Sequence, residues 1–339
     1  MENQKNNFKL RTDLAYDSVS LYSSKVINGL KETKINIENI EIIKHEVTSA
    51  ASEILSKAVG LYYTIDLSKH NFHDHQVSNK IENSVSYVLK EMLKSRNLLG
   101  KKALIVGLGN ANITPDAVGP YVVDNIVVTR HLDVNSELSN GYSVVSAISP
   151  GVMGTTGIET YDIIEAVRNK IDIDYIIVVD ALASSSIARV NKTIQITDTG
   201  IQPGSGVGNK RKEISFRTMR IPVFAIGIPT VVDAACIASN TIDYVIKYLH
   251  LEYNDLVPQV NKLSPGNLDI EFDSIEEPTN ELKEHFLDYE VSYYNPVTTS
   301  GGLMFNYYFK LNDESKNYLR QFRNDFCLRF YLQMDIILW

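Results

Sequence analysis

The order of hydrophobic and polar positions in this chain predicts short buried strands separated by amphipathic helices. Segments that read as strands stand at residues 103–106, 143–148, 173–179, 193–197 and 222–227, and the runs at 103–106 and 173–179 are largely apolar. Helical spacing of apolar residues marks 79–96, 157–171 and 232–249. Continuous apolar strands that alternate with such helices are typical of a mostly parallel sheet covered on both faces. The pattern therefore predicts an α/β fold.

The two ends of the chain show a weaker pattern. Residues 1–13 form a polar arm, residues 14–30 have near-helical apolar spacing, and strand-like runs follow at 35–47 and 61–66. Beyond residue 251, prolines and an acidic segment precede a tail rich in Tyr and Phe. We therefore expect an arm at 1–13, an α/β domain at 14–250, and an extension at 251–339 that is part linker and part helical tail.

Composition narrows the class of protein. The chain has 339 residues, a net charge of -8 and only two cysteines. Acidic balance argues against a general nucleic-acid or anionic-membrane surface, and two cysteines cannot build a disulfide framework. The N-terminus lacks the apolar core of a signal peptide, and the apolar runs are too short to span a membrane. We expect a cytoplasmic protein with no nucleic-acid or membrane partner.

Two aspartates follow predicted strands of the sheet. Asp180 comes directly after an apolar run, and Asp116 lies shortly after the glycine turn that ends the strand at residue 106. Ligands of open α/β sheets bind beyond the carboxyl ends of the strands. Two carboxylates at that edge can share a proton, so that one activates water and the other polarises a carbonyl. Spacing alone favours a plainer interpretation, with Asp116 as a helix cap and Asp180 as a turn former.

Two glycine-rich loops could bring the backbone close to a ligand. In the first, Gly107, Gly109 and Asn110 follow a strand, but Asn112 stands where a dinucleotide-binding motif needs its third glycine. We expect that loop to approach a peptide. The second contains Gly204, Gly206 and Gly208, whose backbone amides could hold an oxyanion or a substrate strand. A flexible surface loop fits its composition equally well.

The remaining candidates for metal or cofactor chemistry are weaker. The glycine loop at 199–211 is not a Walker loop, because Asn209 precedes its lysine and Arg211 follows it. The cluster His73-Asp74-His75 lies in a polar stretch typical of a solvated surface, and His131 is a better candidate for a place near the sheet edge. No metal and no cofactor are expected.

These motifs together resemble the germination protease family of spore-forming Firmicutes. The matching blocks cover roughly residues 100–250. They are LIVGLGN at 104–110, TPDAVGP at 114–120, VTRHL at 128–132, SPGVMGTTGIET at 149–160, DALA at 180–183, TIQITDTGIQPGSGVGNKR at 193–211 and IPVFAIGIPTVVDA at 221–234.

The resemblance implies a function for the two aspartates. The family's essential pair matches Asp116 and Asp180. Its implied activity is endoproteolysis of small acid-soluble spore proteins during germination, in the spore core or forespore. The implied fold is similar to the hydrogenase-maturation proteases, a phosphorylase/hydrolase-like sandwich, and the family is not thought to need the metal that those relatives bind.

The resemblance also implies a self-processing zymogen. Arg11-Thr12-Asp13-Leu14-Ala15 matches the family's cleavage sequence, which makes residues 1–13 a propeptide cut between Asp13 and Leu14. The zymogen is implied to be a homotetramer. The chain departs from the family at Ser184–Ser186, where an arginine is usual, and in its aromatic C-terminal tail.

Two alternatives to a two-aspartate protease stay open. One is a metal-assisted peptidase of the hydrogenase-maturation type that uses Asp116 and Asp180 as ligands with His131 or Glu159. The other is a non-catalytic homologue that binds spore proteins.

Overall fold

The computed structural model describes residues 12–22, 26–70, 75–134, 142–204, 211–238 and 240–241. Residues up to Asp233 belong to one compact unit, and Ala234 begins a second. Of the helix predicted at 232–249, residues 234–238 and 240–241 are helical, and Val232 belongs to a strand. The rest of that helix, the boundary at 250, the extension at 251–339 and arm residues 1–11 lie outside the described residues.

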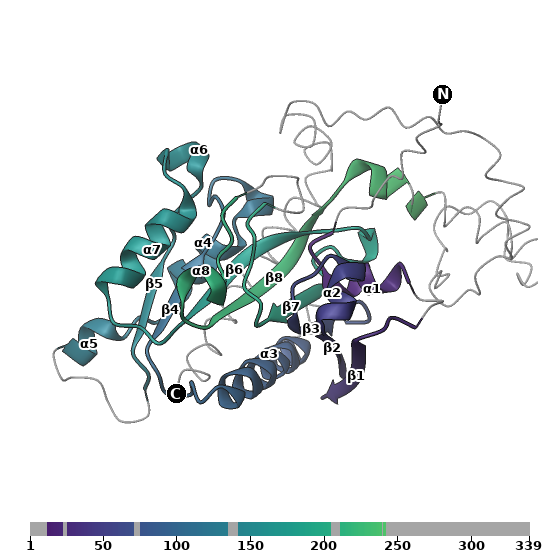
Figure 1. Ribbon diagram of the computed structural model, residues 1–339, viewed down its shortest axis with the longest axis horizontal. Helices are drawn as coiled ribbons and strands as arrows, with labels where there is room; N and C mark the ends of the chain where they lie inside the picture. The colour runs from purple at the N-terminus through teal and green to yellow at the C-terminus, as the bar shows by residue number, and fades with distance from the viewer. Residues whose placement is uncertain are drawn as a thin grey trace, which may run out of the picture. The chain divides into compact units, whose positions relative to one another are not determined.

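An eight-stranded sheet forms the centre of the first unit as far as the structure describes it (Figure 1). In order across the sheet, its strands are β1 (Leu30–Ile37), β2 (Ile40–Val47), β3 (Gly60–Asp66), β7 (Thr193–Thr197), β8 (Val223–Val232), β6 (Tyr175–Ser184), β4 (Ala103–Gly107) and β5 (Val145–Ile148).

The sheet is mixed, so the prediction of a mostly parallel sheet was wrong. Strands β5, β4, β6 and β8 are parallel to one another, whereas β1, β2, β3 and β7 each run antiparallel to their neighbours. The apolar stretch at 35–47 conceals a hairpin, which turns at Glu38 and Asn39 with left-handed φ angles of 52° and 71°. The link from β6 to β7 holds only the 3-10 turn η2 (Ile187–Arg189), too little chain for a parallel crossover.

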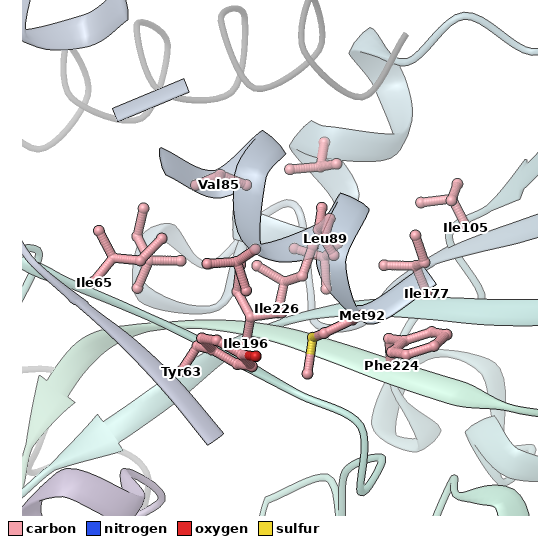
Figure 2. Close-up of a cluster of buried hydrophobic side chains, with 14 of the residues drawn as sticks. Tyr63, Ile65, Val85, Leu89, Met92, Ile105, Ile177, Ile196, Phe224 and Ile226 are labelled. Carbon is pink, nitrogen blue, oxygen red and sulfur yellow. The ribbon is translucent and has the colours of Figure 1, made fainter. Parts of the chain in front are cut away.

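Helix α3 (His75–Ser95) and helix α4 (Val118–Asn125) cover one face of the sheet. Figure 2 shows Val85, Leu89 and Met92 of α3 in one cluster with sheet residues that include Ile177 and Ile226. Alternate residues of each strand point to the same face, so β4 and β6 give their odd-numbered side chains to this core. Truncating one buried side chain of this core, for example by Leu89→Ala in α3, lowers the free energy of unfolding by about 2–5 kcal/mol.

The opposite face has two separate groups of helices. Helix α7 (Thr160–Lys170) and helix α8 (Phe216–Met219) pack on the even-numbered residues of the parallel strands β4 and β6. Helix α1 (Ala15–Ser20) and helix α2 (Ser49–Leu55) pack on Val47 and Tyr62 of the antiparallel strands. This second face is the one that carries Asp180, because Asp180 has the same parity as Ile176 and Val178.

Most of the predicted strands are present, and several are longer than predicted. The predictions of α3, β4, β7 and α7 are confirmed within a few residues. Strand β6 continues to Ser184 and β8 to Val232, and the helix predicted at 14–30 is the six-residue α1. Helix α2 was not predicted. None of the helices in the described ranges has both the length and the apolar character needed to cross a bilayer.

Candidate active site

Asp180 lies within β6, at the point where the neighbouring strand ends. The pairing of β6 with β4 stops at Gly107 and Val179, whereas its pairing with β8 continues to Ser184. Sequence reasoning put Asp180 just beyond a strand, and the structure places it at the carboxyl end of the β4–β6 pair but inside β6. One edge of β6 is therefore open to other segments from Asp180 onward.

The loop after β4 brings Asp116 to that open edge. The loop contains the 3-10 turn η1 (Thr114–Asp116), which packs on β6 and β8. The backbone N–H of Asn110 donates to the carbonyl oxygen of Asp116 at 3.0 Å, and the Thr230 hydroxyl of β8 donates to the carbonyl oxygen of Pro115 at 2.6 Å. These bonds fix the turn against the two strands.

Glycine is required at two points of this loop. Gly109 has a φ of 111°, and a Cβ there would lie 2.0 Å from the Asp116 carbonyl oxygen and 3.0 Å from its Oδ1. Gly119, at the start of α4, would place a Cβ 2.3 Å from the Leu108 carbonyl oxygen and 2.6 Å from that of Val179. The backbone thus approaches itself closely, and Asp116 is held near enough for its charge to act on Asp180.

Burial and like charge govern the two carboxyl groups. Asp180 is 6% exposed, and burial followed by the charge of Asp116 raises its pKa well above the usual range. Burial raises the pKa of Asp116 to about 6. The Ala181 N–H donates to Asp180 Oδ1 at 2.9 Å and opposes the shift. Both shifts favour the protonated forms, so the pair retains a proton at higher pH than a solvated aspartate does.

Two further charges act on this pair. The positive charge of Arg211 lowers the pKa of Asp116 and of Asp180, and the negative charge of Asp13 raises the pKa of Asp180. Sequence reasoning treated Arg211 only as a mismatch to a nucleotide-binding loop. The signal that could have found it is its position at the end of the second glycine-rich loop, in a block that resembles the family's motifs.

Asp13 takes the place that β4 leaves beside β6. Its N–H donates to the Ala183 carbonyl oxygen at 2.8 Å, and the Ala183 N–H donates to Asp13 Oδ2 at 2.9 Å. The next two residues, Leu14 and Ala15, are completely buried. The predicted junction Asp13–Leu14 is therefore docked on the strand that carries Asp180.

A buried carboxylate holds the arm and the serine-rich segment together. Asp17 is 1% exposed, and its Oδ2 accepts hydrogen bonds from the Thr12 hydroxyl, the Ser184 hydroxyl, and the N–H and hydroxyl of Ser185, at 2.7–3.1 Å. Arg189 Nε lies 2.9 Å from Asp17 Oδ1, an ion pair in which the N–H does not align with the oxygen. We call these five residues the Asp17 cluster. The serines at 184 and 185 therefore bind α1 to the end of β6.

The other predicted site residues have mixed placements. Gly107 and Gly109 support the Asp116 loop, and the Asn110 side chain accepts from the Asn112 N–H at 3.0 Å. Gly204 has a left-handed φ of 71°, while Gly206 and Gly208 lie outside the described residues, as do His73 and Asp74. Whether any of these glycines contacts substrate stays a prediction.

The residues considered for a metal site are not gathered into one. His131 is exposed on α5 (Arg130–Val134), and Glu159 is the residue before α7. In the part of the chain that the structure describes, no group of three or more His, Cys, Asp or Glu side chains is arranged to hold a metal ion. The metal-assisted hypothesis thus gains no support from His131 or Glu159.

Comparison with known proteins identifies relatives along most of the chain. A family model described as "Germination protease" matches residues 12–287. The germination protease of Bacillus pumilus is 43% identical over 281 residues, covering 78% of this chain and 76% of the relative. That of Bacillus mycoides is 46% identical over 259 residues, covering 73% and 70%. That of Oceanobacillus iheyensis is 42% identical over 279 residues, covering 79% and 76%.

Proposed function

We propose that this chain, which belongs to the germination protease family, is an endopeptidase that begins the degradation of small acid-soluble spore proteins and uses Asp116 and Asp180 to activate water. Membership of the family makes it a peptidase. The substrate and the catalytic pair are inferences from its residues and from the resemblance of its motifs. The observation that carries them is the placement of two carboxyl groups at the edge where β4 ends, with Asp180 buried on β6 and Asp116 in the turn that packs on β6 and β8.

The pair is suited to peptide hydrolysis because its two members differ in protonation. Asp116, with a pKa of about 6, is mostly ionised at neutral pH and accepts a proton from the attacking water. Asp180 keeps its proton and donates a hydrogen bond to the carbonyl oxygen of the bond being cut. The collapse of the tetrahedral intermediate returns a proton to the departing amine.

The proposal also covers the precursor form of the protein, its fold, its oligomeric state and its compartment. The protein is made as a zymogen that removes residues 1–13 at the Asp13–Leu14 bond, and the docking of Asp13 beside Asp180 supports this. It has the sandwich fold of the hydrogenase-maturation proteases, assembles as a homotetramer and works in the spore core. Mixed strand directions in the sheet are compatible with such a sandwich.

Substitution of the two aspartates tests the proposal. Asp116→Asn and Asp180→Asn each remove one member of the pair, and we expect arm removal and spore-protein cleavage to fall by about 10³-fold or more. Asp172→Asn, which changes an exposed aspartate, is the matched control. N-terminal sequencing and mass spectrometry of the products measure both reactions.

Three outcomes would contradict the proposal. Full activity of either variant would exclude a catalytic pair. Activity that EDTA abolishes and a divalent metal restores would favour the metal-assisted alternative, because the two-aspartate mechanism needs no metal. If the unaltered protein binds spore proteins but cuts neither them nor its own arm, the non-catalytic alternative holds.

A further inference from the structure

Two side chains converge on the carbonyl oxygen of Asp13. Lys57 Nζ donates to this oxygen at 2.8 Å and also to the carbonyl oxygen of Thr12 at 3.1 Å. Gln195 Nε2 donates to the Asp13 oxygen at 3.5 Å. The Asp13 carbonyl belongs to the peptide bond at which the arm is predicted to be cut. Donors from two distant segments therefore meet at that bond.

Lys57 is held in place by the turn that ends α2. Ser56, the residue before it, has a left-handed φ of 54° and stops the helix. The Ser52 hydroxyl then donates to the Lys57 carbonyl oxygen at 2.6 Å. Since the backbone at Lys57 is fixed, its long side chain reaches the arm from a defined origin.

Gln195 is fixed from the other side. Its Oε1 accepts from the Ala15 N–H at 2.6 Å, which orients the amide so that Nε2 points back toward Asp13. In the sheet, Gln195 of β7 pairs with Gly227 of β8, and Gly227 pairs with Asp180 of β6. Paired residues share a face of the sheet, so Gln195 and Asp180 lie on the same face. Gly227, which has no side chain, lies between them.

The Asp13–Leu14 bond is placed on that same face. Asp13 is bonded to β6 through Ala183, and Ala15 is bonded to a side chain of β7. Strand β8 lies between β6 and β7. Residues 13–15 therefore pass across the sheet face that carries Asp180, and the charge of Asp13 is close enough to act on Asp180.

We propose that Lys57, assisted by Gln195, binds the carbonyl oxygen of the Asp13–Leu14 bond and stabilises the negative charge that develops on it while the arm is removed. This inference rests on the proposed function. Water adds its oxygen to the Asp13 carbonyl carbon, the C–N bond to Leu14 breaks, and the two water protons end on the Leu14 amine as the new carboxylate ionises. No other reactant is needed.

The chemistry of the two donors fits this role. An ammonium group is a mobile point charge with three donors, so it can follow the oxygen as the carbonyl becomes tetrahedral. Removal of one donor to such an oxyanion typically slows a reaction by about 10²–10³-fold. Gln195, at the longer distance, contributes less than Lys57.

Substitutions at Lys57 in the full-length chain test the proposal. We expect Lys57→Met to slow arm removal by about 10²-fold or more, Lys57→Arg to restore most of the rate, and Gln195→Glu, which keeps the acceptor for Ala15, to slow it by about tenfold. Arm removal at the unaltered rate in Lys57→Met would overturn the proposal. If Lys57→Met does not fold, Lys57→Gln, which places a neutral donor there, is measured in its place. Arm removal at the unaltered rate in Lys57→Gln would then overturn the proposal.

A purely structural clamp gives a different result. Hydrogen exchange of the Asp13 N–H, which donates to the Ala183 carbonyl oxygen, reports how often the arm leaves the sheet. If Lys57 only holds the arm, arm removal in Lys57→Met falls by no more than the factor by which that exchange rises. A loss of arm removal much larger than that factor supports charge stabilisation. Asp180→Asn is assayed alongside. Arm removal at the unaltered rate in Asp180→Asn would refute the proposed function. No arm removal in Asp180→Asn, together with full arm removal in Lys57→Met, would refute only the role of Lys57.

Discussion

Two buried carboxyl groups at the same end of β6 are compensated in opposite ways. Asp17 is 1% exposed and Asp180 is 6% exposed. One oxygen of Asp17 accepts four hydrogen bonds, and Arg189 forms an ion pair with the other. Within the described residues, Asp180 accepts one hydrogen bond, from its neighbour Ala181, and the carboxylates of Asp116 and Asp13 act against its ionisation.

The contrast separates a carboxylate that holds the structure together from one that can react. Removing a charge from water is costly, and the Asp17 cluster offsets that cost with donors and a cation. At Asp180 the cost is not offset, so the side chain keeps a proton instead. A buried carboxyl group that retains its proton is available for proton transfer, whereas a carboxylate whose oxygens are already occupied by hydrogen bonds and an ion pair is not. The partners, rather than the degree of burial, distinguish the two.

Asp17→Asn should produce the largest loss of stability. The substitution leaves Arg189 without its counter-ion and offers an N–H₂ group where Oδ2 now accepts four hydrogen bonds. We expect a loss of roughly 2–4 kcal/mol, measured by urea denaturation. Asp172→Asn provides the control, since Asp172 also pairs with a cation, Lys102 at 2.6 Å, but in an exposed position. Equal midpoints for the two variants would contradict a stabilising Asp17 cluster.

Asp180→Asn should change stability in the other direction. The folded protein holds a proton on Asp180 that the unfolded chain releases above pH of about 3.9, so wild-type stability falls as the pH rises from about 4 toward neutrality. Asn carries no such penalty. We expect Tm at pH 7 to rise by roughly 3–8 °C relative to wild type, and the gain to shrink toward pH 4. A lower Tm at pH 7 would show that Asp180 is compensated as Asp17 is.

Sequence reasoning placed Asp116 and Asp180 after short apolar strands, and the resemblance of their motifs to the family singled them out as the essential pair. The same local signals gave β4 and β7 nearly to the residue. Strand direction was not encoded in this way. Strand β7 alternates polar and apolar residues, Thr-Ile-Gln-Ile-Thr, which is typical of antiparallel strands, but five such residues are too few to show that it runs opposite to β8.

The residues that sequence reasoning missed owe their roles to that direction. Gln195 meets Asp13 because antiparallel β7 aligns it with Gly227 and Asp180. Asp17 lies in a predicted helix but 168 residues from Ser185, and Lys57 lies in no predicted element and 44 residues from Asp13, whose carbonyl oxygen it contacts. The serines at 184 and 185 looked like a departure from the family, and only their contacts with Asp17 explain them. Such long-range pairings leave no local trace.

Arg211→Met should produce the smallest effect and sharpen the comparison with Arg189. Arg211 lowers the pKa of Asp116 through its charge, with no ion pair to it among the described residues, whereas Arg189 touches Asp17 directly. Without Arg211 the pKa of Asp116 rises further above about 6, so the acidic limb of the profile of kcat/KM against pH moves upward. We expect a displacement of less than about one pH unit, because solvent and salt screen a charge that is not in contact.

Arg217→Met, at an exposed arginine on α8, is the control and should leave the acidic limb in place. A displacement of about two pH units or more would mean that Arg211 contacts the pair as closely as Arg189 contacts Asp17. The charge of the reactive carboxyl groups would then be compensated by a cation, as that of Asp17 is.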